Sequence, residues 1–352
     1  MKYLLETNQS NQEDETHYLD KLKKISRQVQ LSKAQLDHYH GPWRIAKRMV
    51  HPYEYVYSSP CKSKNICNYL PISRSYFKMK EIYQLFLTKY SIQRSFCLAE
   101  APGGFVEALL ETSVPIIYGS SLISSDKDVP DWNHKLHDNE RFHEILGSFQ
   151  NGDLLSFDNV ISIIYQMKRD SCDLITGDGG FDTSDDYNSQ EVRSYPLIYS
   201  EIYIALHLQK LGGCFVCKLF DTFDKKTLSL LYLLSKSYRN VSLYKPSMSR
   251  ISNSEKYVIC EDFRGASIDD LNLLTHHFQT HDLVLPLPPS FLKSMLEPVE
   301  SFSNHQIKSI QKGISYIKKN QLSRKPSSSQ IIQGKKWCLD YDTPLNGNCM
   351  FL

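Results

Sequence analysis

The stretch from Phe96 to Leu110 constrains the fold of this chain more than any other part of the sequence. An apolar run ends in Pro102, Gly103 and Gly104 and then continues with apolar residues at helical spacing. This order predicts a strand, a tight turn and a helix. Glycines let a backbone approach a ligand closely, and the start of a helix presents free N–H groups. The stretch therefore predicts the first crossover of an α/β sheet, although a purely structural turn would show the same pattern.

Strand-like and helix-like segments alternate after this turn. We expect strands near 95–99, 115–121, 143–149, 172–177, 213–220, 240–245 and 255–262, and helices at 104–112, 156–168, 189–211 and 225–238. Several of these strands are apolar on both faces, which is typical of parallel sheets covered by helices. The sequence thus predicts a doubly wound, mostly parallel, seven-stranded sheet whose last two strands form an antiparallel pair at one edge.

The segments that flank this alternating region have a different character. The first dozen residues are polar and are expected to lack regular structure, whereas apolar spacing predicts helices over 18–36, 42–50 and 76–86. Residues 301–339 contain eight Lys or Arg and no acid. This basic segment is either a surface for nucleic acid or a partner, or an ordinary solvated helix face. We expect an N-terminal helical extension at 1–40, a central domain at 41–285 and a basic helical extension with a tail at 286–352.

The bulk composition excludes several classes of protein. The chain has no apolar run of about 18 residues and no signal-peptide core at its N-terminus, so no membrane association is expected. Its nine cysteines indicate reduced thiols and an intracellular protein. Cys214 and Cys217 have C-x-x-C spacing, but they alternate along a strand, which favours packing over metal or redox chemistry. We therefore expect no metal site and a cytoplasmic location, with the nucleus left open.

Three further residues bear chemistry at the ends of the expected strands. Asp178 follows an apolar strand and precedes two glycines, Lys218 lies inside an apolar strand, and Glu255 begins a strand after a basic, hydroxyl-rich loop. Each has an ordinary alternative, such as a turn residue or an edge lysine that reaches solvent. A lysine in an apolar strand is costly unless it is paired or functional, and ligands bind at the carboxyl ends of parallel strands. Their common order along one sheet indicates a single site.

Together these motifs resemble the FtsJ/RrmJ-like ribose 2′-O-methyltransferases, especially the branch that acts on mRNA caps in eukaryotes and large DNA viruses. The residues that carry the resemblance are Glu100–Phe105, Asp178–Phe181, Lys218 and Ser249–Val258, and it covers about residues 40–265. It implies a Rossmann-like methyltransferase fold, S-adenosylmethionine as the methyl donor and a Lys-Asp-Lys-Glu tetrad. The last three tetrad positions match Asp178, Lys218 and Glu255.

The resemblance also implies roles for other residues. The first tetrad lysine belongs on a helix ahead of the glycine-rich turn, where we choose Lys47 over Arg48. Cofactor contacts are implied for one group of residues, namely Glu100, Pro102, Gly103, Gly104, Phe105 and Asp153. RNA contacts are expected for Lys245, Ser249 and Arg250, because phosphates supply much of the affinity for RNA. Burial lowers the pKa of a lysine and nearby acids raise it, so the sequence leaves the pKa of Lys218 open.

The expected function is transfer of a methyl group to a ribose 2′-hydroxyl at the 5′ end of capped mRNA, converting cap0 to cap1 without a metal. Methylation of an internal rRNA or tRNA ribose is an alternative with the same chemistry, and a non-catalytic cofactor- or RNA-binding scaffold is an alternative of another class. Capped RNA is the expected partner, and other capping enzymes and the oligomeric state stay open. The segment Lys336–Asn346 resembles the tails of relatives from large DNA viruses, which implies a viral protein.

Overall fold

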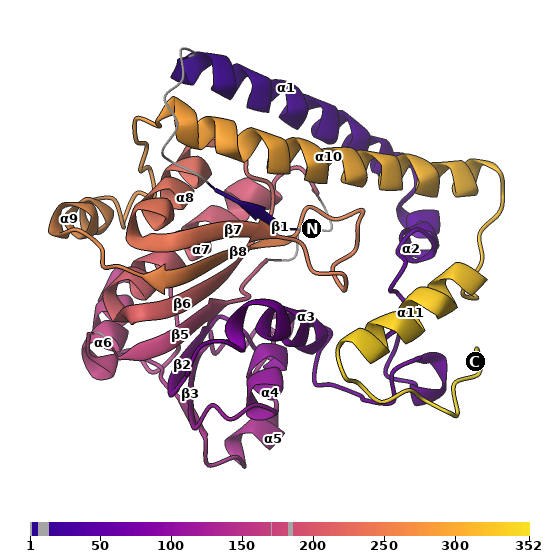
Figure 1. The fold of residues 1–352 in the computed structure, drawn as a ribbon, viewed down its shortest axis with the longest axis horizontal. Helices are drawn as coiled ribbons and strands as arrows, with labels where there is room; N and C mark the ends of the chain where they lie inside the picture. The colour runs from indigo at the N-terminus through magenta and orange to yellow at the C-terminus, as the bar shows by residue number, and fades with distance from the viewer. Residues whose placement is uncertain (1, 6–13, 170, 182–185) are drawn as a thin grey trace.

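The computed structural model describes residues 2–5, 14–169, 171–181 and 186–352, and one mixed sheet forms its centre (Figure 1). The strand order is β1-β7-β8-β6-β5-β2-β3-β4. The block from β4 to β6 is parallel, β8 is antiparallel to both of its neighbours, and β1 is antiparallel to β7. The strands are β1 (Lys2–Leu4), β2 (Arg94–Leu98), β3 (Ile116–Ser120), β4 (Phe142–Glu144), β5 (Cys172–Gly177), β6 (Gln209–Leu219), β7 (Tyr238–Tyr244) and β8 (Lys256–Phe263).

The seven predicted strands are all present, and the sheet gains an eighth. Lys2, Tyr3 and Leu4 pair with Tyr244, Leu243 and Ser242. The expectation that the first dozen residues lack regular structure is therefore wrong for these three residues. The prediction for residues 6–12 lies outside the described residues. The last two strands do pair antiparallel, but β8 lies between β6 and β7, and β1 rather than this pair forms the sheet edge.

Helices cover both faces of the sheet (Figure 1). One core contains apolar residues of α1 and α6 to α10, and a second lies under α3, α4 and α11. Cys217 and Cys214 fall in the first and second core respectively, which confirms that they face opposite sides of β6. The helices are α1 (Glu15–Ala34), α2 (His40–Met49), α3 (Ser75–Ile82), α4 (Gly104–Leu110), α5 (His134–His137), α6 (Phe157–Met167), α7 (Gln190–Leu208), α8 (Lys225–Ser237), α9 (Ile268–His276), α10 (Pro289–Lys318) and α11 (Ser328–Asp340).

The N- and C-terminal segments pack on the sheet domain and on each other. Helices α1 and α10 lie side by side, and Trp43 of α2 packs against Ile310 and Ile314 of α10 (Figure 1). Trp337 of α11 donates a hydrogen bond to Glu81 of α3 at 3.1 Å. The boundaries at 40/41 and 285/286 therefore do not separate independent cores. Among the described residues, no helix has both the length and the apolarity needed to cross a membrane.

Candidate active site

A cavity of about 650 Å³ opens at the carboxyl ends of β2, β3, β5 and β6. Its walls come from the loops that follow these strands, including Ala99–Pro102 after β2 and Asp178 with Phe181 after β5. The volume lies within the range of about 300–1,000 Å³ that is usual for small-molecule sites. The topology thus places the cavity where open α/β sheets bind ligands.

The two glycines of the turn do not line this cavity and pack closely against other parts of the chain. Gly103 has φ +110°, and a Cβ there would lie 2.2 Å from Cδ1 of Leu136. A Cβ on Gly104 would lie 2.2 Å from the hydroxyl oxygen of Ser75. Phe105 is fully buried and stacks on the ring of Tyr257 with centroids 5.9 Å apart. These three predicted cofactor residues therefore support the turn, whereas the cavity wall is formed by their neighbours.

Three of the predicted cofactor residues do line the cavity, namely Glu100, Pro102 and Asp153. Glu100 is 4% exposed, and its two buried carboxyl oxygens lie beside the side chains of Thr176 and Cys97. Burial raises the pKa of Glu100 well above its usual range. Asp153 accepts a hydrogen bond from the amide of Leu155 at 2.9 Å. A buried acid in the wall of a ligand-sized cavity fits a ligand that carries a positive charge or hydrogen-bond donors.

Asp178 and Lys218 line this cavity, and Lys78 and Glu255 lie next to them. We call these four charged side chains the four-residue cluster. Nζ of Lys218 lies 3.4 Å from Oδ1 of Asp178 and donates a hydrogen bond to the Asp178 carbonyl at 2.6 Å. Nζ of Lys78 lies 2.9 Å from Oε2 of Glu255. The four side chains are each only 11–12% exposed. Asp178, Lys218 and Glu255 are thus brought together as the sequence predicted.

The charges of the cluster determine which of its groups are ionised. Burial acts to raise the pKa of Glu255, but Lys78 and Lys218 outweigh it and lower that pKa to about 2. For Lys218, burial acts to lower the pKa, and Asp178, Glu255 and Glu201 together overcome it and raise the pKa. The structure thereby answers what the sequence left open. In the protein alone, Lys218 is an ammonium group at neutral pH.

The structure does not place Lys47 in this cluster. Lys47 lies on α2 and lines a separate cavity of about 90 Å³ together with Arg250. Its pKa is lowered by burial and by Arg250, a group outside the cluster. Lys78 occupies the position beside Glu255 instead, on the helix that directly precedes the glycine-rich turn. Nearness to the turn in the sequence could have indicated Lys78, because α3 is closer than α2 to the glycine-rich turn.

Tyr257 is a further residue of the site that the sequence motifs did not indicate. The hydroxyl of Tyr257 donates a hydrogen bond to Oδ1 of Asp178 at 2.6 Å, and its ring lies 5.9 Å from Nζ of Lys78. Tyr257 is the direct neighbour of Lys218 in the register of β6 and β8. Alternation along a strand would have indicated it, because residues 255 and 257 point to the same face. Tyr257 therefore connects both halves of the cluster.

The loop that leads into β8 differs from the expected RNA surface. Lys245 uses its ammonium group internally, donating to the carbonyls of Asn253 and Glu255 at 2.7 and 2.6 Å and to the hydroxyl of Ser249 at 3.4 Å. Ser249 is 2% exposed. These two residues hold the loop together and are not available to a phosphate. Arg250 keeps a side chain that is 31% exposed.

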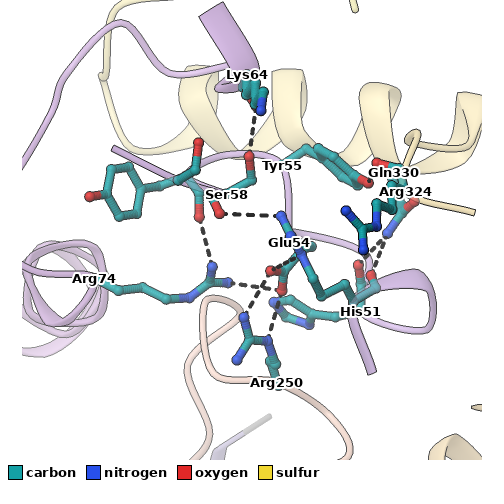
Figure 2. Close-up of polar contacts among 12 residues, drawn as sticks. His51, Glu54, Tyr55, Ser58, Lys64, Arg74, Arg250, Arg324 and Gln330 are labelled. Atoms are coloured by element: carbon teal, nitrogen blue, oxygen red, sulfur yellow. Dashed lines mark hydrogen bonds and ion pairs between the residues drawn. The ribbon is translucent and has the colours of Figure 1, made fainter. Parts of the chain in front are cut away.

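Arg250 belongs to a group of charges that we call the Glu54 hub, formed by Glu54 with Arg48, Arg74 and Arg250. Figure 2 shows Glu54 between Arg74 and Arg250. Glu54 is fully buried, and Arg250 contacts both of its carboxylate oxygens at 2.8 Å. Burial acts to raise the pKa of Glu54, but the arginines lower it. Arg74 also lines the large cavity. The hub therefore ties the β8 loop to the cavity wall.

A comparison with protein families matches residues 71–263 to the FtsJ-like methyltransferases, which is more than half of the chain. The chain belongs to the FtsJ-like methyltransferase family. The match contains the glycine-rich turn and the whole four-residue cluster, Lys78 included, whereas Lys47 lies outside it. The expected Rossmann-type fold is thereby confirmed.

Three curated relatives of this FtsJ-like chain carry the name cap-specific mRNA (nucleoside-2′-O-)-methyltransferase 1. The protein of Trypanosoma brucei brucei is 33% identical over 169 residues, which covers 47% of this chain and 45% of the relative. The mouse protein is 33% identical over 187 residues, covering 49% of this chain and 22% of the relative. The human protein is 31% identical over 208 residues, covering 53% of this chain and 24% of the relative. The chain thus spans less than half the length of these relatives.

Proposed function

We propose that this chain transfers a methyl group from S-adenosylmethionine to a ribose 2′-hydroxyl at the 5′ end of capped RNA. The observation that carries the proposal is the four-residue cluster beside a ligand-sized cavity, within the segment that belongs to the FtsJ-like family. The names of the curated relatives support the cap as the target.

The cavity has the features that the cofactor requires. Bound S-adenosylmethionine supplies a methyl group on a positively charged sulfonium. Glu100, Pro102 and Asp153 are the residues that would hold it, because all three line the cavity and two of them are acids. A positive charge in the cavity would lower the raised pKa of Glu100 and so favour its charged form. The residues present therefore fit this cofactor.

Lys218 is the residue that we expect to act on the ribose hydroxyl. Its ammonium group, already placed by Asp178, can donate a hydrogen bond to the 2′-oxygen and hold it in position. Lys218 can accept the hydroxyl proton only after it loses its own, and a positive charge nearby favours that loss. Asp178 and Glu255 oppose it by raising the pKa of Lys218. Lys218 therefore positions the 2′-hydroxyl whether or not its own amine is protonated.

Lys78 takes the first tetrad position in this proposal, in place of Lys47. It neutralises Glu255, whose carboxylate would otherwise stabilise the charged form of Lys218 more strongly. Tyr257 donates to Asp178 and so limits how that carboxylate turns. Lys78 and Tyr257 are positioning residues, because each acts through an acid that faces Lys218.

The test uses labelled cofactor with two short RNAs of the same sequence, one capped and one uncapped. We expect the label on the capped RNA, at the 2′-oxygen of the first transcribed nucleotide, as mapped by nuclease digestion. Equal labelling of both RNAs would contradict the cap as the target, and internal labelling would favour an rRNA- or tRNA-type substrate. No labelling of either RNA, with the cofactor bound, would favour a non-catalytic scaffold.

A further inference from the structure

A second polar pocket lies outside the family-matched segment and away from the large cavity. It has a volume of about 190 Å³ and is lined by Arg44, Ile45, Arg48, Tyr55, Ser323 and Arg324. We call it the arginine pocket. Its walls come from α2 and from the linker between α10 and α11, which are almost 280 residues apart in the sequence. Only the packing of the C-terminal extension creates it.

The pocket is strongly positive. Its lining contains three arginines and no carboxylate. Among the residues that the structure describes, Arg44 and Arg324 form no ion pair, and both are exposed. Arg48 pairs with Glu54 at 3.1 Å, but Glu54 also serves Arg74 and Arg250. The charge of Glu54 is thus shared among Arg48, Arg74 and Arg250 and neutralises Arg48 only in part. The pocket therefore keeps an excess of positive charge.

Hydrogen bonds hold the two walls of the pocket in place. Tyr55 donates its hydroxyl to the carbonyl of Arg324 at 2.7 Å. Gln330 of α11 donates to the carbonyls of Arg48 and His51 at 2.9 and 2.8 Å. Figure 2 shows Gln330 beside His51. Gln330 thereby satisfies backbone carbonyls at the end of α2 that have no partner within the helix. Hydrogen bonds therefore fix the backbone of both segments that carry the arginines of the pocket.

We propose that the arginine pocket binds phosphates of the RNA chain that enters the active site. Planar guanidinium groups match phosphate oxygens in pairs, and an excess of positive charge without carboxylates favours a polyanion. The Glu54 hub connects the pocket to the active site, because Arg48 lines the pocket and Arg74 lines the large cavity. This link favours RNA over an acidic protein partner. The inference rests on the proposed function and adds a second RNA-binding position to it.

The test compares two double variants in RNA binding, measured by fluorescence anisotropy with labelled 10-nucleotide RNA at several salt concentrations. Arg44→Ala with Arg324→Ala removes two charges from the pocket. Lys24→Ala with Arg27→Ala removes two charges from exposed positions of α1 and is the matched control. Each lost phosphate contact should reduce the slope of log affinity against log salt by about 0.7, so the pocket variant should lose about 1.4 and the control none.

Two further measurements make the outcome unambiguous. Cofactor binding should stay unchanged in both variants, and Arg44→Lys with Arg324→Lys should restore most of the slope because it restores the charge. Equal slopes in the pocket variant and the wild type, or equal losses in the pocket variant and the control, would overturn the proposal. A reduced slope in a protein that methylates neither RNA would leave the pocket standing while the proposed reaction fails. Binding of an acidic peptide with unchanged RNA binding would assign the pocket to a protein partner and overturn the proposal.

Discussion

Replacing Lys78 with methionine should remove stability in a way that depends on pH. The Lys78–Glu255 pair has an N–O distance of 2.9 Å, and both side chains are 12% exposed. The pKa of Glu255 is lowered from 4.5 to about 2, and each pKa unit corresponds to about 1.4 kcal/mol. The charged environment of Glu255 is thus worth about 3 kcal/mol, and Lys78 is its largest favourable contributor. We expect Lys78→Met to lower the free energy of unfolding by about 2 kcal/mol at pH 7.

The sign of the pH dependence follows from the lowered pKa. The contribution of Glu255 is complete above about pH 4.5 and is lost as the pH falls through about 2, where the folded carboxylate takes up its proton. Urea unfolding at pH 7 and at about pH 3 should therefore show the gap between Lys78→Met and the wild type shrinking by about 40%. Lys47→Met is the control and should change stability by less than about 1 kcal/mol at either pH, since Lys47 forms no ion pair with a described residue.

Methyl transfer gives a second readout of the same pair of variants. We expect Lys78→Met to lose transfer and Lys47→Met to keep its turnover rate at saturating RNA. A stability gap for Lys78→Met that does not change with pH would refute the ion pair with Glu255 as its cause. Loss of transfer only in Lys47→Met would return the first tetrad position to Lys47.

Three other substitutions test separate parts of the site. Lys218→Ala should abolish transfer while calorimetry shows cofactor affinity within about threefold, because Lys218 is expected to contact the ribose hydroxyl rather than the cofactor. Normal turnover of the variant would exclude this role for Lys218. Gly103→Ala should cost about 2 kcal/mol or more in thermal unfolding, because φ is +110° and the new Cβ would lie 2.2 Å from Leu136. Glu54→Gln should lower the free energy of unfolding in urea by roughly 3 kcal/mol, because it leaves the arginines of the hub around a neutral amide. An unchanged midpoint would mean that the hub does not stabilise the β8 loop.

The site was predictable from the sequence where strand ends carry it. Asp178 and Lys218 lie in or directly after parallel strands, and such strands bring their carboxyl ends to one edge of the sheet. Lys78 was not found in this way, because its partner Glu255 is 177 residues away in the chain and only the packing of α3 brings them together. Lys245 and Ser249 looked exposed as part of a polar loop, but the loop folds on itself and uses their donors internally.

The amino-acid sequence by itself determined the α/β class, the alternation of strands and helices after the glycine-rich turn, and the turn itself. These features depend on periodicity and on residues close together in the chain, and local physics decides them. Only the tertiary structure decided which lysine contacts Glu255 and that Arg44 and Arg324 line one pocket. It also decided that nearby acids raise the pKa of Lys218 more than burial lowers it. Each of these depends on distances between remote segments. Charges interact through space rather than along the chain, so only the packed protein determines their partners.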